Sequence, residues 1–231
     1  MLKEFVLQTA VNLILAIIPP VLGYGLGRTP PGRIRVGTVA LGLVWLAFLP
    51  NTTYLITEWR HFLFDEPFTT WREGGQFDRS GMFMTAVAGF LYMGYASFGI
   101  LAFALALRPV ERLFRQRGWR LFPWTPILFF LVSLGVYIGL IDRLNSWDVF
   151  HPDRVCFRCL GALSRPRSVL GITGFAVFLW LAYEAVDLWF DGLIERWNHY
   201  LGTRRLANRR STSTTNAAEM SKTRDQPANR E

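Results

Sequence analysis

The chain has 231 residues, of which 51% are hydrophobic and 15% aromatic, and it carries a formal net charge of +8. This length allows a single domain, whereas so apolar a composition argues against an ordinary basic soluble protein. The Lys and Arg residues follow the loops between apolar segments and do not gather on one soluble module, so we expect no nucleic-acid partner.

Five apolar segments are each long enough to cross a bilayer core of about 30 Å, since a helix rises about 1.5 Å per residue. They lie near residues 5–26, 36–57, 82–107, 123–141 and 168–190. The sequence therefore predicts an all-α, polytopic membrane protein with about five transmembrane helices and the lipid bilayer as its surroundings. Residues 1–201 form the multi-span membrane domain, and residues 202–231 form a basic, Ser/Thr-rich tail whose composition predicts disorder.

The first apolar segment resembles a signal peptide only in its position. Its short leader contains Glu4, no clear small-residue cleavage site follows, and the segment ends in a glycine-rich stretch from Gly23 to Gly27. We interpret it as an uncleaved span.

The second segment ends in polar residues at the mouth of a membrane span. Asn51, Tyr54, Glu58 and His61 are spaced three, four and three residues apart, which places them on one helical face if the helix continues past Pro50. Because lipid offers no hydrogen bonds, such a stripe favours a site for a headgroup, a metal or a proton. The competing interpretation is a capped, kinked helix end whose polar side chains satisfy one another and water.

A polar cluster with Arg143, Asn145 and Asp148 follows the fourth segment. Arg143 has the paired donors that hold a phosphate or a carboxylate, so it is a candidate clamp for a phosphate group. A structural ion pair with Glu58 or Asp142 is the alternative.

Glu58, His61, Asp78 and Asp148 are weak candidates for a divalent metal site, because oxygen and nitrogen ligands of this kind could activate a bound water. The chain has no His-Glu-x-x-His, Gly-x-Ser-x-Gly or phosphate-binding loop, so its motifs indicate no enzyme class. No other cofactor is evident, and whether the protein is an enzyme stays open.

Cys156 and Cys159 form one Cys-x-x-Cys flanked by Arg154 and Arg158. The pair could be a local disulfide, two ordinary thiols or, with His151, part of a zinc site. We favour the disulfide or the two thiols, because no fourth zinc ligand is obvious.

Four acids, Glu184, Asp187, Asp191 and Glu195, follow one face of the fifth segment, and the first two lie inside the predicted span. Ionised groups are costly in hydrocarbon, so Glu184 and Asp187 are candidates for a proton or cation path. The alternative is pairing with the basic loop between the third and fourth segments.

The distribution of basic residues sets the expected topology. Most Lys and Arg residues fall in the loops after the first and third segments and after the fifth, which favours an outside N-terminus and a cytoplasmic C-terminus. The inner loops should attract anionic lipid headgroups. Both polar clusters then lie at the outer face of a bacterial cytoplasmic (inner) membrane.

Two passages and one residue pair carry a family resemblance. They are residues 45–58 with His61 and Phe62, residues 143–149 with Asn145-Ser146-Trp147-Asp148, and the pair Phe77-Asp78. They resemble an uncharacterised bacterial integral-membrane family, number thirteen sixty-one among the domains of unknown function, over about residues 36–190. This chain has Glu58 where we expect the family to carry aspartate.

The resemblance implies an intact multi-span membrane protein and no particular activity. The absent catalytic motifs and the acids Glu184 and Asp187 favour a transport or assembly role for a membrane protein with a polar site at its outer face. The alternative is an enzyme acting on a lipid or lipid-linked substrate at the outer leaflet, with the metal as its cofactor.

Overall fold

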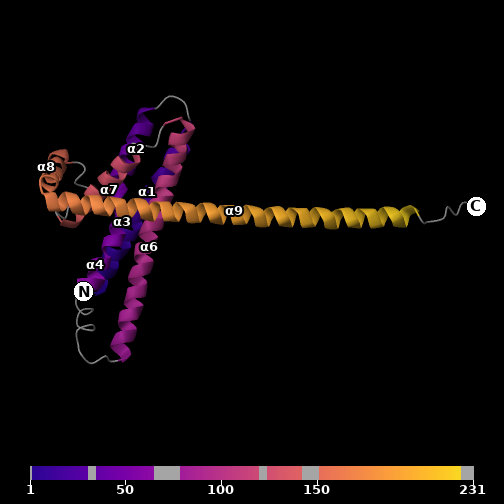
Figure 1. The fold of residues 1–231 in the computed structure, drawn as a ribbon, viewed down its shortest axis with the longest axis horizontal. Helices are drawn as coiled ribbons and strands as arrows, with labels where there is room; N and C mark the ends of the chain where they lie inside the picture. The colour runs from indigo at the N-terminus through magenta and orange to yellow at the C-terminus, as the bar shows by residue number, and fades with distance from the viewer. Residues whose placement is uncertain (1, 31–34, 65–78, 120–123, 142–150, 225–231) are drawn as a thin grey trace, which may run out of the picture. The chain divides into compact units, whose positions relative to one another are not determined.

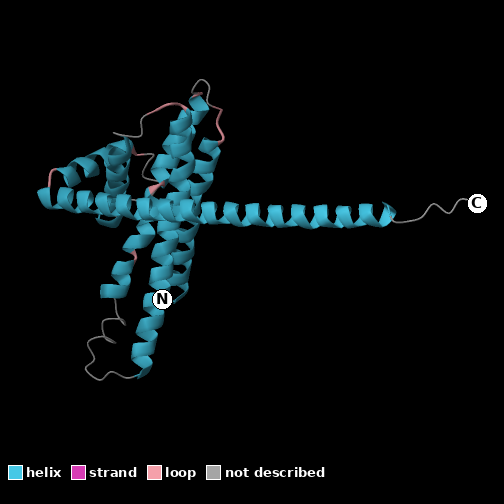
Figure 2. Ribbon diagram, turned by 45° about the vertical axis from the view of Figure 1, so that its right-hand side comes forward, coloured by secondary structure: helices cyan, strands magenta, loops and turns pink. Residues whose placement is uncertain are grey.

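The computed structural model describes residues 2–30, 35–64, 79–119, 124–141 and 151–224, and these residues are almost entirely helical (Figure 2). The chain divides into two compact units, Met1–Val186 and Asp187–Glu231, which are described separately. The helices are α1 (Leu2–Gly27), α2 (Val36–Phe48), α3 (Pro50–Thr57), α4 (Trp59–Phe64), α6 (Arg79–Gln116), α7 (Trp124–Ile141), α8 (Pro152–Leu163) and α9 (Pro166–Arg224), as labelled in Figure 1.

Among the described residues, five helical stretches are long and apolar enough to cross a membrane. They are Thr9–Gly27, Val36–Thr57, Gly81–Gln116, Trp124–Ile141 and Pro166–Tyr200. The predicted all-helical fold with about five spans is therefore confirmed, and the chain is a multi-pass membrane protein by the length and composition of its helices. Helix α9 continues to Arg224 into the segment for which the sequence predicts disorder, and the disorder of that tail stays a prediction.

The second span consists of two helices, because Pro50 interrupts the backbone hydrogen bonds and becomes the first residue of α3. Leu49, at the junction, keeps right-handed helical dihedrals of φ −55° and ψ −39°. Glu58, between α3 and α4, does so as well, with φ −62° and ψ −17°. The chain therefore continues in one direction from α2 through α3 to α4, and α3 and α4 lie alongside α6 (Figure 1).

Close contact between α3 and α6 depends on a glycine. A Cβ atom on Gly99 would lie 2.6 Å from the carbonyl oxygen of Thr52 and 2.9 Å from Cβ of Leu55. On the other side of α3, a Cβ on Gly135 of α7 would lie 2.7 Å from Cγ of Pro50. Small residues at such points let helix backbones approach closely in a membrane, where packing is the main attraction between helices.

A cluster of three aromatic rings holds α6, α7 and the first part of α9 together within the first unit. The ring centroids of Phe103 and Phe129 are 5.6 Å apart, and those of Phe103 and Tyr183 are 6.2 Å apart. Phe129 and Tyr183 complete the triangle at 5.9 Å, and all three side chains are buried. The geometry between Phe103 and its two neighbours is edge-to-face, which is favourable for aromatic pairs.

Candidate functional site

The polar side chains around Pro50 bond to the backbone of their own helix. Asn51 Nδ2 donates to the carbonyl of Phe48 at 3.1 Å, and Thr52 Oγ1 donates to the carbonyl of Leu49 at 2.7 Å. Thr53 Oγ1 donates to the carbonyl of Pro50 at 3.1 Å, and the side chains of Thr52 and Thr53 are fully buried. These bonds satisfy carbonyls at the start of α3, where the helical pattern is interrupted.

One helical turn further along, a second polar group gathers around Tyr95 of α6. Tyr95 shares a hydrogen bond with the side chain of Asn12 in α1 and interacts electrostatically with Glu58, Tyr54 and Tyr92. We call these five residues, Asn12, Tyr54, Glu58, Tyr92 and Tyr95, the Tyr95 cluster. Its members come from α1, α6 and the C-terminal end of α3, so the cluster joins three elements of the first unit.

The buried face of α1 brings Asn12 into this cluster. Ala16, Pro19 and Gly23 are buried and follow Asn12 at helical spacings of three and four residues. The side-chain amide therefore begins the stripe with which α1 packs against its neighbours. An amide at this depth needs a hydrogen-bond partner, and Tyr95 supplies it.

The contact between Gly99 and α3 sets the register that brings Tyr95 to Glu58. Helix α6 runs antiparallel to α3 and α4, because Gly99 contacts Thr52 and Gly89 contacts the ring of Phe62. Tyr95 lies between these two glycines, one turn from Gly99. Glu58 lies between Thr52 and Phe62 and therefore opposes Tyr95.

Aromatic rings extend the cluster beyond Glu58. The ring centroids of Trp59 and Phe62 are 5.2 Å apart, and those of Phe62 and Tyr92 are 5.7 Å apart. A carboxylate near phenol rings is a combination that can bind cations, because the faces of aromatic rings attract positive charge. A cationic amine is therefore the ligand chemistry that these residues suit.

The structure brings together part of the predicted polar stripe. Tyr54 and Glu58 interact with Tyr95, while the amide of Asn51 bonds to the backbone. His61 belongs to α4, but its side chain lies outside the described part of the chain. The predicted residues that also lie outside the described residues are Asp78, Arg143, Asn145 and Asp148.

Sequence reasoning missed Asn12, Tyr92 and Tyr95. Asn12 carries a signal that could have been used, because it is an amide within an otherwise apolar run and such groups need partners in a membrane. Tyr92 and Tyr95 carry little signal, since tyrosine is common in spans with or without a site.

The metal prediction depends on residues that the structure leaves out. Within the described ranges, no group of three or more His, Cys, Asp or Glu residues is placed to hold a metal ion. Asp78, Asp148 and the side chain of His61 lie outside those ranges, so a divalent metal at Glu58 stays a prediction.

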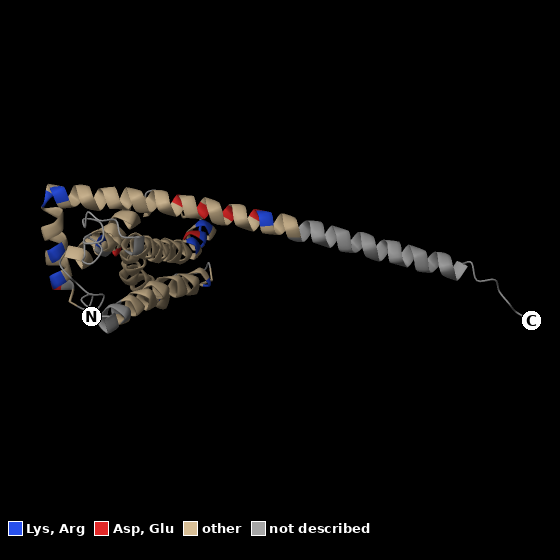
Figure 3. Ribbon diagram, turned by 90° about the horizontal axis from the view of Figure 1, so that it is seen from below, with Lys and Arg blue, Asp and Glu red and all other residues tan. Residues whose placement is uncertain are grey.

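The acids of α9 follow one another along the helix (Figure 3). In the first unit, Trp180 Nε1 donates to Glu184 Oε1 at 3.1 Å, one turn away along α9. In the second unit, Asp187 is half-buried and Asp191 is exposed. The bond from Trp180 gives Glu184 a local partner, and a proton or cation path along these acids stays a prediction.

Both cysteines are free thiols on α8, with Cys156 exposed and Cys159 half-buried. Burial raises the pKa of the Cys159 thiol, and the neighbouring Cys156 raises it further. Because the thiolate is the reactive form, Cys159 should react with N-ethylmaleimide more slowly than Cys156 at neutral pH. The rates are measured by peptide mass spectrometry on detergent-solubilised protein, and equal rates from pH 7 to pH 9 would contradict this expectation.

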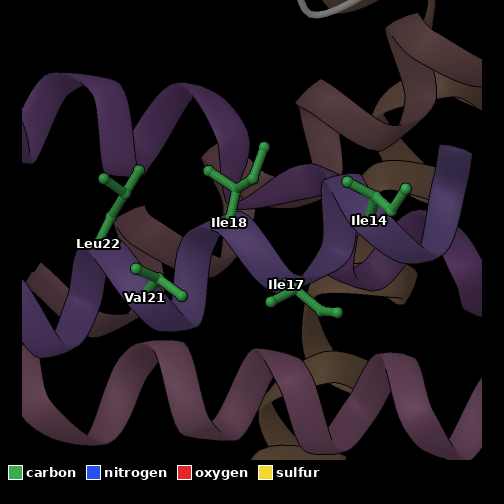
Figure 4. Close-up of a pocket in the computed structure, with 5 residues that line it drawn as sticks. All are labelled: Ile14, Ile17, Ile18, Val21 and Leu22. Atoms are coloured by element: carbon green, nitrogen blue, oxygen red, sulfur yellow. The ribbon is translucent and has the colours of Figure 1, made fainter.

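An apolar groove of about 260 Å³ lies along α1 and is lined by Ile14, Ile17, Ile18, Val21 and Leu22 (Figure 4). At 100° per residue, Ile14 and Val21 lie on the side of α1 opposite to Asn12. The groove therefore does not join the Tyr95 cluster, and its apolar lining suits contact with lipid chains.

The chain is similar to one family of known sequences. No curated protein and no solved structure matches it. A family model matches residues 11–182, a range that begins just before Asn12 and includes Tyr54, Glu58, Tyr92 and Tyr95. Since this range covers more than half of the chain, the chain belongs to the family described as "Protein of unknown function (DUF1361)".

Proposed function

We propose that this protein binds the headgroup of a membrane lipid, or of a lipid-linked molecule, that carries a cationic amine. The binding groups are the Glu58 carboxylate and the aromatic rings of the Tyr95 cluster. The role that fits such a site is that of a transport or assembly component. The observation that supports the proposal is the position of Glu58 and Tyr54 beside Tyr95, next to the hydrogen bond between Tyr95 and Asn12.

The depth of Glu58 supports a headgroup as the ligand. The apolar stretch Val36–Thr57 ends immediately before Glu58, which supports a position of the carboxylate near the boundary between acyl chains and headgroups. The side chain of Glu58 is half-buried, so part of it remains open to a ligand at this depth. An amine headgroup lies at the same boundary and carries the charge opposite to that of a carboxylate.

The proposed location is the bacterial cytoplasmic membrane, with the N-terminus outside, the C-terminus in the cytoplasm and the Tyr95 cluster at the outer face. One hydrogen bond supports this orientation. Arg117 NH2 donates to the carbonyl of Pro30 at 3.3 Å. This bond places the basic loops after α1 and α6 at the same end of the first unit. Anionic headgroups of the inner leaflet are the expected partners of that end.

Thermal unfolding in detergent tests the amine preference. Phosphatidylethanolamine should raise the Tm of the wild-type protein more than phosphatidylglycerol with the same acyl chains. A ligand at one hundred times its Kd stabilises the folded state by about 2.7 kcal/mol. Glu58→Gln should abolish the difference between the two lipids, because it removes the charge and keeps the shape of the side chain.

Glu195→Gln is the matched control, since Glu195 is an exposed acid in the second unit. This variant should keep the wild-type preference for phosphatidylethanolamine. Equal stabilisation of the wild-type protein by both lipids would contradict the proposal, as would a preference that persists in Glu58→Gln.

A further inference from the structure

Helix α8 has three sides of different chemistry. At 100° per residue, Val155, Cys159 and Ala162 share one side, and Ala162 is buried with Cys159 packed beside it against a cluster of Leu134, Ile138 and Ile172. A second side carries the large apolar residues Phe157, Leu160 and Leu163, and a third side carries the exposed Arg154 and Arg158.

The apolar side is exposed in the part of the chain that the structure describes. Phe157 is 75% exposed and Leu160 is 68% exposed, although both are large apolar residues on a helix that also contains two arginines. In a water-exposed loop this arrangement would be unfavourable, whereas at a membrane surface it is the pattern of a helix that lies in the interface.

The contacts of α8 place it at the depth of the lipid boundary. Its packed side touches Leu134 and Ile138, which lie seven and three residues before the end of the span Trp124–Ile141. At about 1.5 Å per residue, these contacts reach about 5 to 10 Å into the span. Ile172 lies six residues inside the next span, so both neighbouring helices give the same depth.

Two further features hold α8 at this position. It ends at Leu163, and α9 begins at Pro166, so two intervening residues separate α8 from a membrane span. Two residues reach about 7 Å when fully extended, which keeps the end of α8 at the surface. A hydrogen bond of 2.7 Å between Tyr137 and Ser168 joins α7 to the start of α9, next to α8.

From these observations we propose that α8 is an interfacial helix docked into the bilayer that surrounds the protein. The side with Phe157, Leu160 and Leu163 contacts lipid acyl chains, and Arg154 and Arg158 on the third side bind the phosphates of lipid headgroups. The partner is thus the phospholipid interface itself, matched by apolar surface on one side of α8 and by positive charge on another. This surface is separate from the Tyr95 cluster, and the inference does not depend on the function proposed for that cluster.

Spin labels on α8 test the proposal in liposomes of phosphatidylcholine and phosphatidylglycerol. In a Cys156→Ser, Cys159→Ala background, single cysteines replace Arg154, Phe157, Arg158 and Leu160, and each carries a nitroxide. Collision rates with oxygen, which dissolves in lipid, are compared with those of a water-soluble nickel chelate. Labels at 157 and 160 should gain access to oxygen and lose access to nickel, and labels at 154 and 158 should show the reverse.

Each other outcome overturns the proposal. Access of all four labels to nickel would place α8 in water, and protection of labels 157 and 160 from both reagents would indicate a protein partner or a second copy. Where a background variant fails to fold, native Cys156 provides a label next to Leu160 in a chain that carries only Cys159→Ala. That label should likewise collide with oxygen more often than with nickel.

Discussion

Gly99→Val should lower the free energy of unfolding of this protein by about 1 to 3 kcal/mol, the usual cost of overpacking a close contact. Any side chain at this position meets the Thr52 carbonyl oxygen at 2.6 Å, and backbone atoms cannot rotate away. Helices α3 and α6 must therefore separate, which also moves Glu58 away from Tyr95. The variant should lose both stability, measured by unfolding in denaturing detergent, and the preference for phosphatidylethanolamine.

Gly94→Val is the matched control for this substitution. Gly94 lies on the same helix α6, and a Cβ at this position meets no atom within 4 Å. Both substitutions change helix propensity in the same way, so their difference isolates the contact with α3. If the two variants unfold alike, Gly99 does not set the distance between α3 and α6.

Phe103→Ala should cost about 3 to 5 kcal/mol of unfolding free energy, because it removes the ring that contacts both Phe129 and Tyr183 and leaves a cavity. Phe103 is 1% exposed, and its ring meets both neighbours edge-to-face. Its loss should loosen the contacts that join α6 to α7 and α9. Unfolding in denaturing detergent, followed by tryptophan fluorescence, measures the cost.

Phe90→Ala tests whether this cost comes from packing. Phe90 lies on the same helix but is 78% exposed, so lipid or detergent can replace the contacts of its ring. The substitution should change the unfolding free energy far less than Phe103→Ala. Similar losses in the two variants would mean that the ring cluster contributes little.

The spans could be predicted from the sequence because hydrocarbon requires long apolar helices whatever their arrangement. The C-terminal end of α6 could not. Helix α6 continues to Gln116, although the apolar run ends near residue 107. Pro109 and the charged residues after it end the hydrophobic pattern, but the backbone stays helical, since hydropathy reports the membrane boundary and not the helix end.

Two of the five residues of the Tyr95 cluster followed from helical spacing. Tyr54 and Glu58 lie four residues apart, and the spacing alone predicts a common face. Their partners Asn12 and Tyr95 depend on which faces of α1 and α6 meet α3. Close contacts such as that of Gly99 determine those faces, and the sequence does not reveal which of its 20 glycines make such contacts.

Asn51 shares the helical face of Tyr54, and its amide also makes a local hydrogen bond, to the Phe48 carbonyl beside the proline break. Short polar side chains often bond to backbone carbonyls of the preceding turn. This bond is of the kind that the capped-end interpretation describes, and a place for Asn51 in the polar site stays a prediction. Glu58 stays the residue on which the proposed headgroup site depends.

Native mass spectrometry of the protein released from its membrane measures that site directly, by counting the phospholipids that remain bound. The wild-type protein should retain phosphatidylethanolamine in preference to phosphatidylglycerol, and Glu58→Gln should lose this preference while Glu195→Gln keeps it. Retention of phosphatidylethanolamine by Glu58→Gln at the wild-type level would contradict an amine-headgroup site at the Tyr95 cluster.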